Sequence, residues 1–193
     1  MKKKIALVLA AMMAVGSMGM ASFAEETEAQ VTELNWEAVE PIMEAIGIEG
    51  DFVTFDEVAV KMWLPSILDE VELTDEDKEA GYIGYYETGE DAESEAAVSV
   101  VYVDLGGMEL SEYAEKVAEE DGVSDVEMAT VNGLPCVTYE LKDQDSGVLA
   151  FMTEAGYGLE ITCSPVSTEE AQSMLAFILS SIMPTEEAAE TEA

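Results

Sequence analysis

The sequence predicts an α+β domain with a single antiparallel β-sheet and helices packed on both of its faces, that is, an α/β/α sandwich. Four short strand-like segments follow one another between residues 126 and 163. Turn residues such as Asn132-Gly133 join them, which is typical of an antiparallel meander. Residues 98–103 are almost entirely apolar, which indicates a strand covered on both faces. Amphipathic helical patterns occur near the start, the middle and the end of the chain.

The first half of the domain begins with a helix and continues with strands. Asn35 can cap this helix, and Trp36, Val39 and Met43 recur on one helical face. The alternating apolar and polar residues that follow are typical of half-buried strands, and Thr74 can cap a short helical turn between them. The predicted elements are a helix over 35–46, strands over 52–55, 58–64, 81–87 and 97–104, and a helical turn within 66–80.

The second half places the meander between two helices. Ser167 and Glu170 have the spacing of a capping box, and an apolar stripe follows them, so the last helix has the clearest pattern in the chain. The predicted elements are a helix over 111–120, strands over 126–131, 135–141, 147–154 and 158–163, and a helix over 168–182. The expected order of elements is therefore α-β-β-β-β-α-β-β-β-β-α.

Residues 1–24 have the pattern of a secretory signal peptide. Three lysines at 2–4 precede an apolar run over 5–15, and Ser22-Phe23-Ala24 places small residues where a signal peptidase cuts. No cysteine lies near this point, so we expect a secreted or extracytoplasmic protein with no lipid anchor. The expected organisation is a signal peptide over 1–24, a flexible acidic segment over 25–32, a single α/β domain over 33–184 and a flexible acidic tail over 185–193.

The charge of the chain limits its partners and its chemistry. The chain holds 43 acidic residues, no histidine and no arginine, and its formal net charge is −36. Phosphate binding needs clustered basic residues, so we expect neither nucleic acid nor an anionic membrane surface as a partner, whereas a basic or cell-envelope partner fits. Without imidazole there is no histidine base, no Ser-His-Asp triad and no His-ligated zinc.

Three groups of residues are candidates for specific roles. Asp143, Asp145 and Glu154 occupy the first, third and twelfth positions of a calcium-loop pattern, which makes them weak metal-ligand candidates, although turn residues alone explain the pattern. Tyr82 and Tyr86 are expected to share one strand face and form a candidate binding surface. The third group is the pair of cysteines, Cys136 and Cys163. These fall at opposite ends of non-neighbouring predicted strands, so we expect two free thiols rather than a disulfide.

Several segments resemble the PsbP-like sandwich group, which includes photosystem II extrinsic proteins, DcrB-type envelope proteins and many secreted bacterial proteins. The resemblance covers about residues 50–184 and is carried by fold-level patterns. These are the Phe-Val-Thr-Phe strand at 52–55, the step Trp63-Leu64-Pro65, the hairpin Val-Asn-Gly-Leu-Pro-Cys-Val-Thr-Tyr-Glu at 131–140 and the helix Ile-Leu-Ser-Ser-Ile at 178–182. The resemblance implies an accessory or binding role on the outer side of a membrane, and it transfers no functional residue.

These observations favour an exported, non-enzymatic binding or accessory protein without a cofactor and without catalytic residues. Two alternatives from other classes stay open. One is a secreted hydrolase that uses carboxylates or a Ser-Lys pair, and the other is a cation-binding acidic surface protein.

Overall fold

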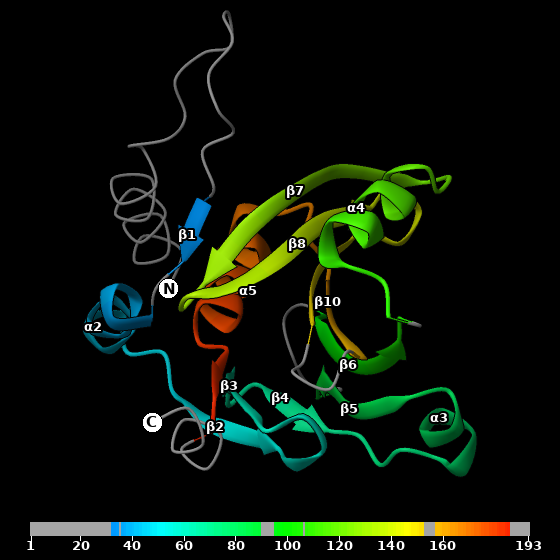
Figure 1. Cartoon of the computed structure of the whole chain (residues 1–193). Helices are drawn as coiled ribbons and strands as arrows, with labels where there is room; N and C mark the ends of the chain where they lie inside the picture. The colour runs from blue at the N-terminus through cyan, green and yellow to red at the C-terminus, as the bar shows by residue number, and fades with distance from the viewer. Residues whose placement is uncertain (1–31, 35, 90–94, 106, 153–156, 186–193) are drawn as a thin grey trace, which may run out of the picture.

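The computed structural model describes residues 32–34, 36–89, 95–105, 107–152 and 157–185 (Figure 1). The predicted signal peptide therefore lies outside the described residues. The helices are α2 (Trp36–Ile46), α3 (Asp75–Glu79), α4 (Leu110–Ala118) and α5 (Glu169–Ser180), with 3-10 turns at Asp56–Val58 and Lys142–Gln144. The strands are β1 (Thr32–Leu34), β2 (Gly50–Phe55), β3 (Val60–Pro65), β4 (Leu68–Glu70), β5 (Tyr82–Thr88), β6 (Ala97–Asp104), β7 (Val123–Val131), β8 (Leu134–Leu141), β9 (Ser146–Met152), β10 (Tyr157–Ser164) and β11 (Met183–Pro184).

The described strands form two sheets, so the prediction of a single sheet is wrong. The main sheet has eight strands in the order β1-β7-β8-β9-β10-β6-β5-β4. All its neighbours are antiparallel except β1, which runs parallel to β7. The small sheet has the order β11-β3-β2. Its two longer strands match the predicted strands at 52–55 and 58–64, but they pair with each other and with the end of the chain rather than with the meander.

Helices cover both faces of the main sheet, as the apolar strands predicted. One face packs against α4 through a cluster that includes Tyr113, Val137, Tyr139 and Val148. The other face packs against α5 and the small sheet. This largest core cluster includes Met62 of β3, Val100 of β6, Leu149 of β9, Ile161 of β10, and Ile178 and Ile182 at the end of α5. The strands β2 and β3 therefore share the cover of this face with α5. Figure 1 shows α2 outside α5, next to the small sheet.

A third cluster attaches α2 to the small sheet and to α5. Trp36, Val39 and Met43, the helical face predicted from the sequence, pack against Trp63 of β3 and Phe177 of α5. The rings of Trp36 and Trp63 lie 6.1 Å apart between centroids. The amphipathic pattern of α2 is thus explained by the small sheet rather than by the main sheet.

The side chain of Asn132 connects three parts of the fold. Asn132 lies in the tight β7–β8 turn with φ 46°, and Gly133 follows with φ 82°, so both occupy the left-handed region that such a turn needs. Its amide nitrogen donates to the backbone oxygens of Ser180 and Ile182, each at 2.7 Å. Its amide oxygen accepts from the backbone N–H of Trp36 at 3.0 Å. Asn35, the predicted cap of α2, lies outside the described residues.

A buried serine makes a second connection at the same end of α5. The Ser181 hydroxyl donates to the backbone oxygen of Ile178 at 2.6 Å and accepts from the backbone N–H of Trp63 at 2.8 Å. Ser181 is fully buried, so both bonds satisfy groups that water cannot reach. The end of α5 is therefore bound to the turn of the main sheet through Asn132 and to the small sheet through Ser181.

The helix caps confirm one prediction and correct another. Thr74 begins α3 with a reciprocal capping box to Asp77, and these hydrogen bonds lower the pKa of the Asp77 carboxyl group. At α5, Thr168 rather than Ser167 is the N-cap, since the Thr168 hydroxyl accepts from the N–H of Ala171 at 3.1 Å. The Ser167 hydroxyl instead donates to the Asp145 carboxylate at 2.7 Å, which holds it away from the helix.

Replacing Asn132 tests its role as a connector. Asn132→Ala removes three hydrogen bonds and places alanine in left-handed backbone, so we expect the free energy of unfolding to fall by about 2–4 kcal/mol. Asn132→Gly keeps the backbone preference and loses the amide, so it should recover about 1 kcal/mol of that loss. Urea denaturation monitored by circular dichroism measures both. A loss within about 0.5 kcal/mol of zero for the alanine variant would show that the amide does not hold these parts together.

Candidate functional site

The best candidate site among the described residues is an open groove at the β4 end of the main sheet. Its volume is about 960 Å³. We call it the acidic groove, because four carboxylates line it together with apolar groups. The lining includes Asp69 and Glu70 of β4, Val71, Tyr85 and Glu87 of β5, Glu95 before β6, Ala97 of β6, and Pro165 after β10.

Strand pairing brings two of these carboxylates together. Asp69 of β4 is paired directly with Glu87 of β5. Side chains paired across antiparallel strands have β-carbons about 4.5–5.5 Å apart, and like charges at that distance destabilise the pair. Within the described part of the chain, neither Asp69 nor Glu87 forms a salt bridge, so no lysine offsets this repulsion there. The groove therefore combines an open volume with an unbalanced negative charge.

Two tyrosines near the groove have raised pKa values, first through burial and then through its carboxylates. The pKa of Tyr85 is raised by burial and by the charge and hydrogen bond of Glu87. Burial, followed by the charge of Glu70, raises the pKa of Tyr86 to about 12. A negative field disfavours an ionised phenol, so both shifts have the sign that surrounding carboxylates impose.

Tyr82 and Tyr86, which the sequence predicts on one strand face as a binding surface, lie on opposite faces of β5. Tyr82 is paired with Val101 and Tyr86 with Val98, and a bulge between Tyr82 and Gly84 shifts the register. Residues 98 and 101 of the regular strand β6 point to opposite faces, so the two tyrosines do too. Tyr86 is buried, and its ring packs edge-on against Phe55 with centroids 6.5 Å apart. The single extra residue at the bulge explains why the alternating pattern misplaced Tyr82.

The calcium-loop pattern is not a calcium loop. Asp143 lies in a 3-10 turn and Asp145 follows it with φ 49°, after which the chain extends as β9. The oxygens of the Asp145 carboxylate accept from the backbone N–H of Val166 at 3.3 Å and from the Ser167 hydroxyl at 2.7 Å, so this side chain anchors the segment before α5. Glu154 lies outside the described residues. An extended strand of seven residues separates the two ends of the pattern, whereas a calcium loop folds around its ion.

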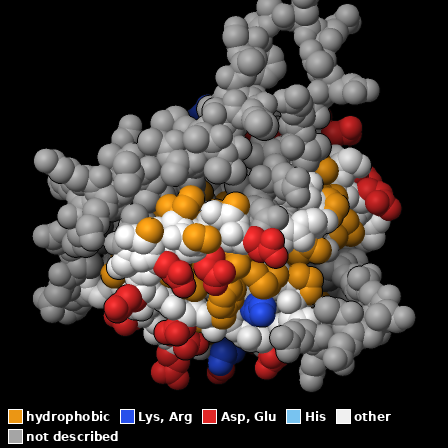
Figure 2. Space-filling view, turned by 90° about the vertical axis from the view of Figure 1, so that its left-hand side faces the viewer, with side chains coloured by type: hydrophobic (Ala, Val, Ile, Leu, Met, Phe, Trp, Pro, Cys, Tyr) orange, Lys and Arg blue, Asp and Glu red, His pale blue; other side chains and the backbone are white. Residues whose placement is uncertain are grey.

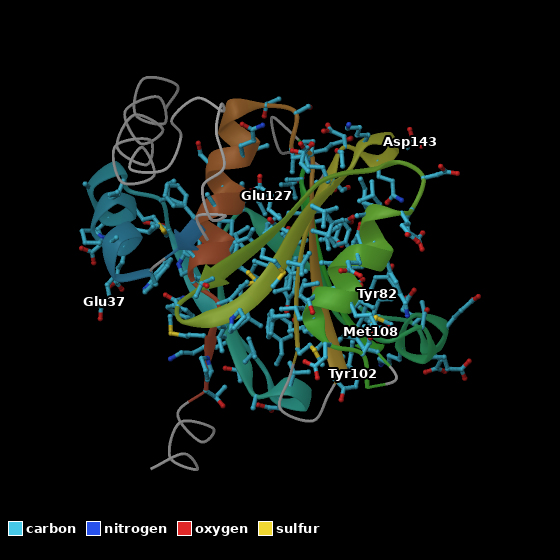
Figure 3. The ribbon with its side chains drawn as sticks, turned by 45° about the horizontal axis from the view of Figure 1, so that its top comes forward. Glu37, Tyr82, Tyr102, Met108, Glu127 and Asp143 are labelled. Carbon is cyan, nitrogen blue, oxygen red and sulfur yellow. The ribbon has the colours of Figure 1, made fainter. Side chains whose placement is uncertain are left out.

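The fold keeps the candidate residues apart. Asp143 lies in the turn between β8 and β9, Tyr82 begins β5, and the strands β10 and β6 lie between β9 and β5 in the main sheet (Figure 3). In the described ranges, no three Asp, Glu or Cys side chains are placed to hold a metal ion. None of the helices that the structure describes is long and apolar enough to cross a membrane.

A polar network beneath α4 was missed by the sequence analysis. The Tyr113 hydroxyl donates to the Glu160 carboxylate and lies 3.0 Å from the Tyr139 hydroxyl. Burial, then its hydrogen bonds to Glu160 and Tyr139, raises the pKa of Tyr113, and burial raises the pKa of Tyr139 to about 12. Both phenols are therefore protonated donors at neutral pH and not bases. The sequence feature that could have indicated this network is Glu160, a carboxylate between two apolar residues of a buried strand.

The two cysteines are free and buried, as predicted. Cys136 is paired with Phe151 and Cys163 with Gly147, so four residues of β9 separate them along the strand direction, about 13 Å. Burial raises the pKa of Cys136 to about 11 and that of Cys163 to about 12. The nucleophilic form of a cysteine is the thiolate, so neither thiol is activated.

Three buried serines and two lysines are engaged in structural interactions. The hydroxyls of Ser146, Ser180 and Ser181 donate to backbone oxygens. Lys116 pairs with Glu112 at 3.7 Å, and Lys61 lies over the ring of Phe52 at 5.4 Å from its centroid. These serines and these two lysines do not form the Ser-Lys pair that a hydrolase would need.

No protein-family model matches the sequence, and no curated protein matches it. Among solved structures, the chain is similar to the PsbP protein of Synechocystis sp. PCC 6803, with 8% identity and a TM-score of 0.49, over 71% of this chain and 93% of that one. It is also similar to the Ran-binding protein Mog1p of Saccharomyces cerevisiae, with 11% identity and a TM-score of 0.44, over 73% of this chain and 98% of that one. The neighbours thus include a PsbP protein, but likenesses this distant carry no argument about a partner.

The shifted tyrosines make the fold sensitive to alkali. The pKa values of Tyr86, Tyr113 and Tyr139 are raised above their ordinary value of 10.0, so the stability that these groups confer is complete below about pH 10. It is lost as the pH rises through the folded-state values, which begin at about 12. We expect phenolate absorbance to show these three tyrosines ionising only together with loss of the circular dichroism signal. Seven tyrosines that ionise as one group near pH 10 in folded protein would contradict the burial of these phenols.

Proposed function

We propose that this chain is an exported, non-enzymatic binding or accessory protein that binds a positively charged partner in the acidic groove. The observation that carries the proposal is the direct pairing of Asp69 with Glu87 at an open groove. Such a pair costs stability in the free protein, and a cationic group placed between the two carboxylates would remove the cost. The groove is therefore poised to gain more from a cation than a scattered acidic surface would.

The composition of the chain supports a basic partner. With a net charge of −36, the protein attracts basic molecules at long range and repels phosphate-rich ones. The groove volume of about 960 Å³ lies within the range of ligand sites, and it can hold a small molecule or several side chains. The apolar groups beside the carboxylates, such as Val71 and Tyr85, suit the aliphatic stems of lysine or arginine.

The state of the reactive groups supports binding rather than turnover. The cysteine thiols and the phenols of Tyr113 and Tyr139 are held protonated by burial. Asp145, one of the three residues of the calcium-loop pattern, uses its carboxylate to hold the segment before α5. Groups that are committed to the fold in this way are poor nucleophiles and poor general bases.

Export is part of the proposal and rests on the sequence. The basic residues at 2–4, the apolar run and the small residues before position 25 fit a cleaved signal peptide. The partner would then be met outside the cytoplasmic membrane. Basic proteins or basic segments of the cell envelope are the class of partner that this location and this charge favour.

Hexalysine is a simple probe of the groove. We expect it to bind in low salt and more weakly at physiological ionic strength, where charges are screened beyond about 8 Å. A groove variant replaces the four carboxylates by amides: Asp69→Asn, Glu70→Gln, Glu87→Gln and Glu95→Gln. A control variant removes the same number of charges from exposed helix positions: Glu40→Gln, Glu44→Gln, Glu115→Gln and Glu119→Gln.

Calorimetric titration separates the two variants. The groove variant should bind hexalysine about tenfold or more weakly than the wild type, about 1.4 kcal/mol, whereas the control variant should stay within about twofold. Without a probe, the groove variant should melt at a higher temperature than the wild type, because the Asp69–Glu87 repulsion is gone. Equal loss of affinity in both variants would show that only the overall charge attracts the probe, and the groove would not be the site.

A further inference from the structure

The small sheet has an open edge at β2. Within the part of the chain that the structure describes, β2 pairs with β3 and has no strand on its other side. The register is continuous over six residues from Gly50 to Phe55, without a bulge. An edge strand of this length presents unpaired backbone groups to which another strand can add.

The hydrogen bonds of β3 show which backbone groups of β2 point outward. The N–H of Trp63 donates to Ser181, on the β11 side of β3, so it points away from β2. Phe52 is paired with Trp63, and in such a non-hydrogen-bonded pair both residues turn their N–H and C=O groups away from each other. The outward set on β2 is therefore the alternate residues Gly50, Phe52 and Thr54.

The other three sheet edges are blunted, whereas β2 is not. At the ends of the main sheet, β1 and β4 have three residues each, and at the other end of the small sheet β11 has two and ends in Pro184. Short edge strands and proline are the devices by which proteins prevent strand addition. The β2 edge has neither.

The exposed residues along β2 give this edge an apolar centre. Phe52 is 42% exposed although it is a large apolar residue, and its ring contacts Trp36 edge-on with centroids 5.4 Å apart. The ammonium group of Lys61 lies over the same ring. Figure 2, which faces the side of the molecule that carries α2, shows hydrophobic side chains exposed among acidic ones. Phe52 therefore places one exposed aromatic ring at the centre of this edge.

We propose that the β2 edge binds an extended, lysine- or arginine-bearing segment of a partner protein, which adds to the small sheet as a strand beside Gly50–Phe55. Charge selects this occupant. Exposed carboxylates flank the outward set at Glu49, Asp51 and Asp56. The segments of this chain outside the described residues that follow the signal peptide are themselves acidic, EETEAQV before β1 and EEAAETEA after residue 185. Repulsion therefore disfavours them at this edge.

A second copy of the chain is disfavoured for the same reason. Two protomers would each bring a net charge more negative than −36 once the three lysines of the signal are removed. Pairing two β2 edges would also place two sets of the same carboxylates close together. A basic partner instead gains from the field that opposes self-association.

The geometry sets the pattern of the partner strand. The residue opposite Phe52 forms a hydrogen-bonded pair with it and lies on the same face, beside the aromatic groups, so an apolar residue fits there. The next position lies on the face of Asp51 or Val53, where a basic residue can reach the carboxylate. An alternation of lysine with valine meets both requirements. This surface is distinct from the acidic groove, and the proposal does not depend on the groove being used.

The test uses a blocked Lys-Val-Lys-Val-Lys-Val peptide and the full-length mature chain. Thr54→Pro removes an outward N–H without removing a bond to β3, because proline is tolerated on the open side of an edge strand. Thr54→Val keeps the N–H and is the matched control. A second peptide carries N-methyl groups on alternate amides, so that it keeps its charge and loses its ladder hydrogen bonds. Both variants are also made in the groove variant described above, so that binding in the groove is removed.

Calorimetry measures the affinity for each peptide, and sedimentation measures the mass of the protein in solution, which shows whether it is a monomer or a dimer. We expect Thr54→Pro or N-methylation to weaken binding about tenfold or more, Thr54→Val to stay within about twofold, and the groove background to preserve this difference. If Thr54→Pro does not fold, the comparison of the two peptides on the groove variant with an unchanged Thr54 decides. Equal binding of both peptides, absence of binding, or a dimer that forms through this edge instead would overturn the proposal.

Discussion

The arrangement of this protein depends on how the end of α5 is held between two sheets. Ile178 in its last turn and Ile182 just beyond it belong to the central core, and the polar groups at the same end are bound by Asn132 and Ser181. Backbone oxygens at a helix end have no partner within the helix, so burying this end requires such donors. Once α5 is fixed there, the chain that follows it pairs with β3 as β11.

This arrangement also decides which surfaces are left open. The backbone N–H of Trp63 points toward Ser181 and Lys61 pairs with Met183 of β11, so the residues of β2 opposite them direct their backbone groups away from β3. At the far end of the main sheet, the short strand β4 places Asp69 opposite Glu87. Both open features lie on a chain with a large negative charge, and our proposals assign a basic partner to each for that reason.

Local pattern predicted most helices and strands but not their assembly. The apolar stripes of α2 and α5 and the meander of β7 to β10 each follow from a period that the sequence shows directly. The division into two sheets does not follow from such a period, because the alternation of a strand does not indicate which sheet the strand joins. Strands of two or three residues, such as β1, β4 and β11, are too short for any period. The acidic groove could not be predicted for this reason, because the pairing of Asp69 with Glu87 depends on β4. Among 43 acidic residues, the sequence also does not distinguish these two from the others.

Amide hydrogen exchange followed residue by residue tests the central claim most directly. The claim is that the end of α5 closes one side of β3 and leaves the outer side of β2 open. The free protein should show slow exchange at Trp63, whose N–H is bound to Ser181, and rapid exchange at Phe52 and Thr54, whose N–H groups point outward. Slow exchange at Phe52 and Thr54, or rapid exchange at Trp63, would contradict this account of the fold and of its open edge.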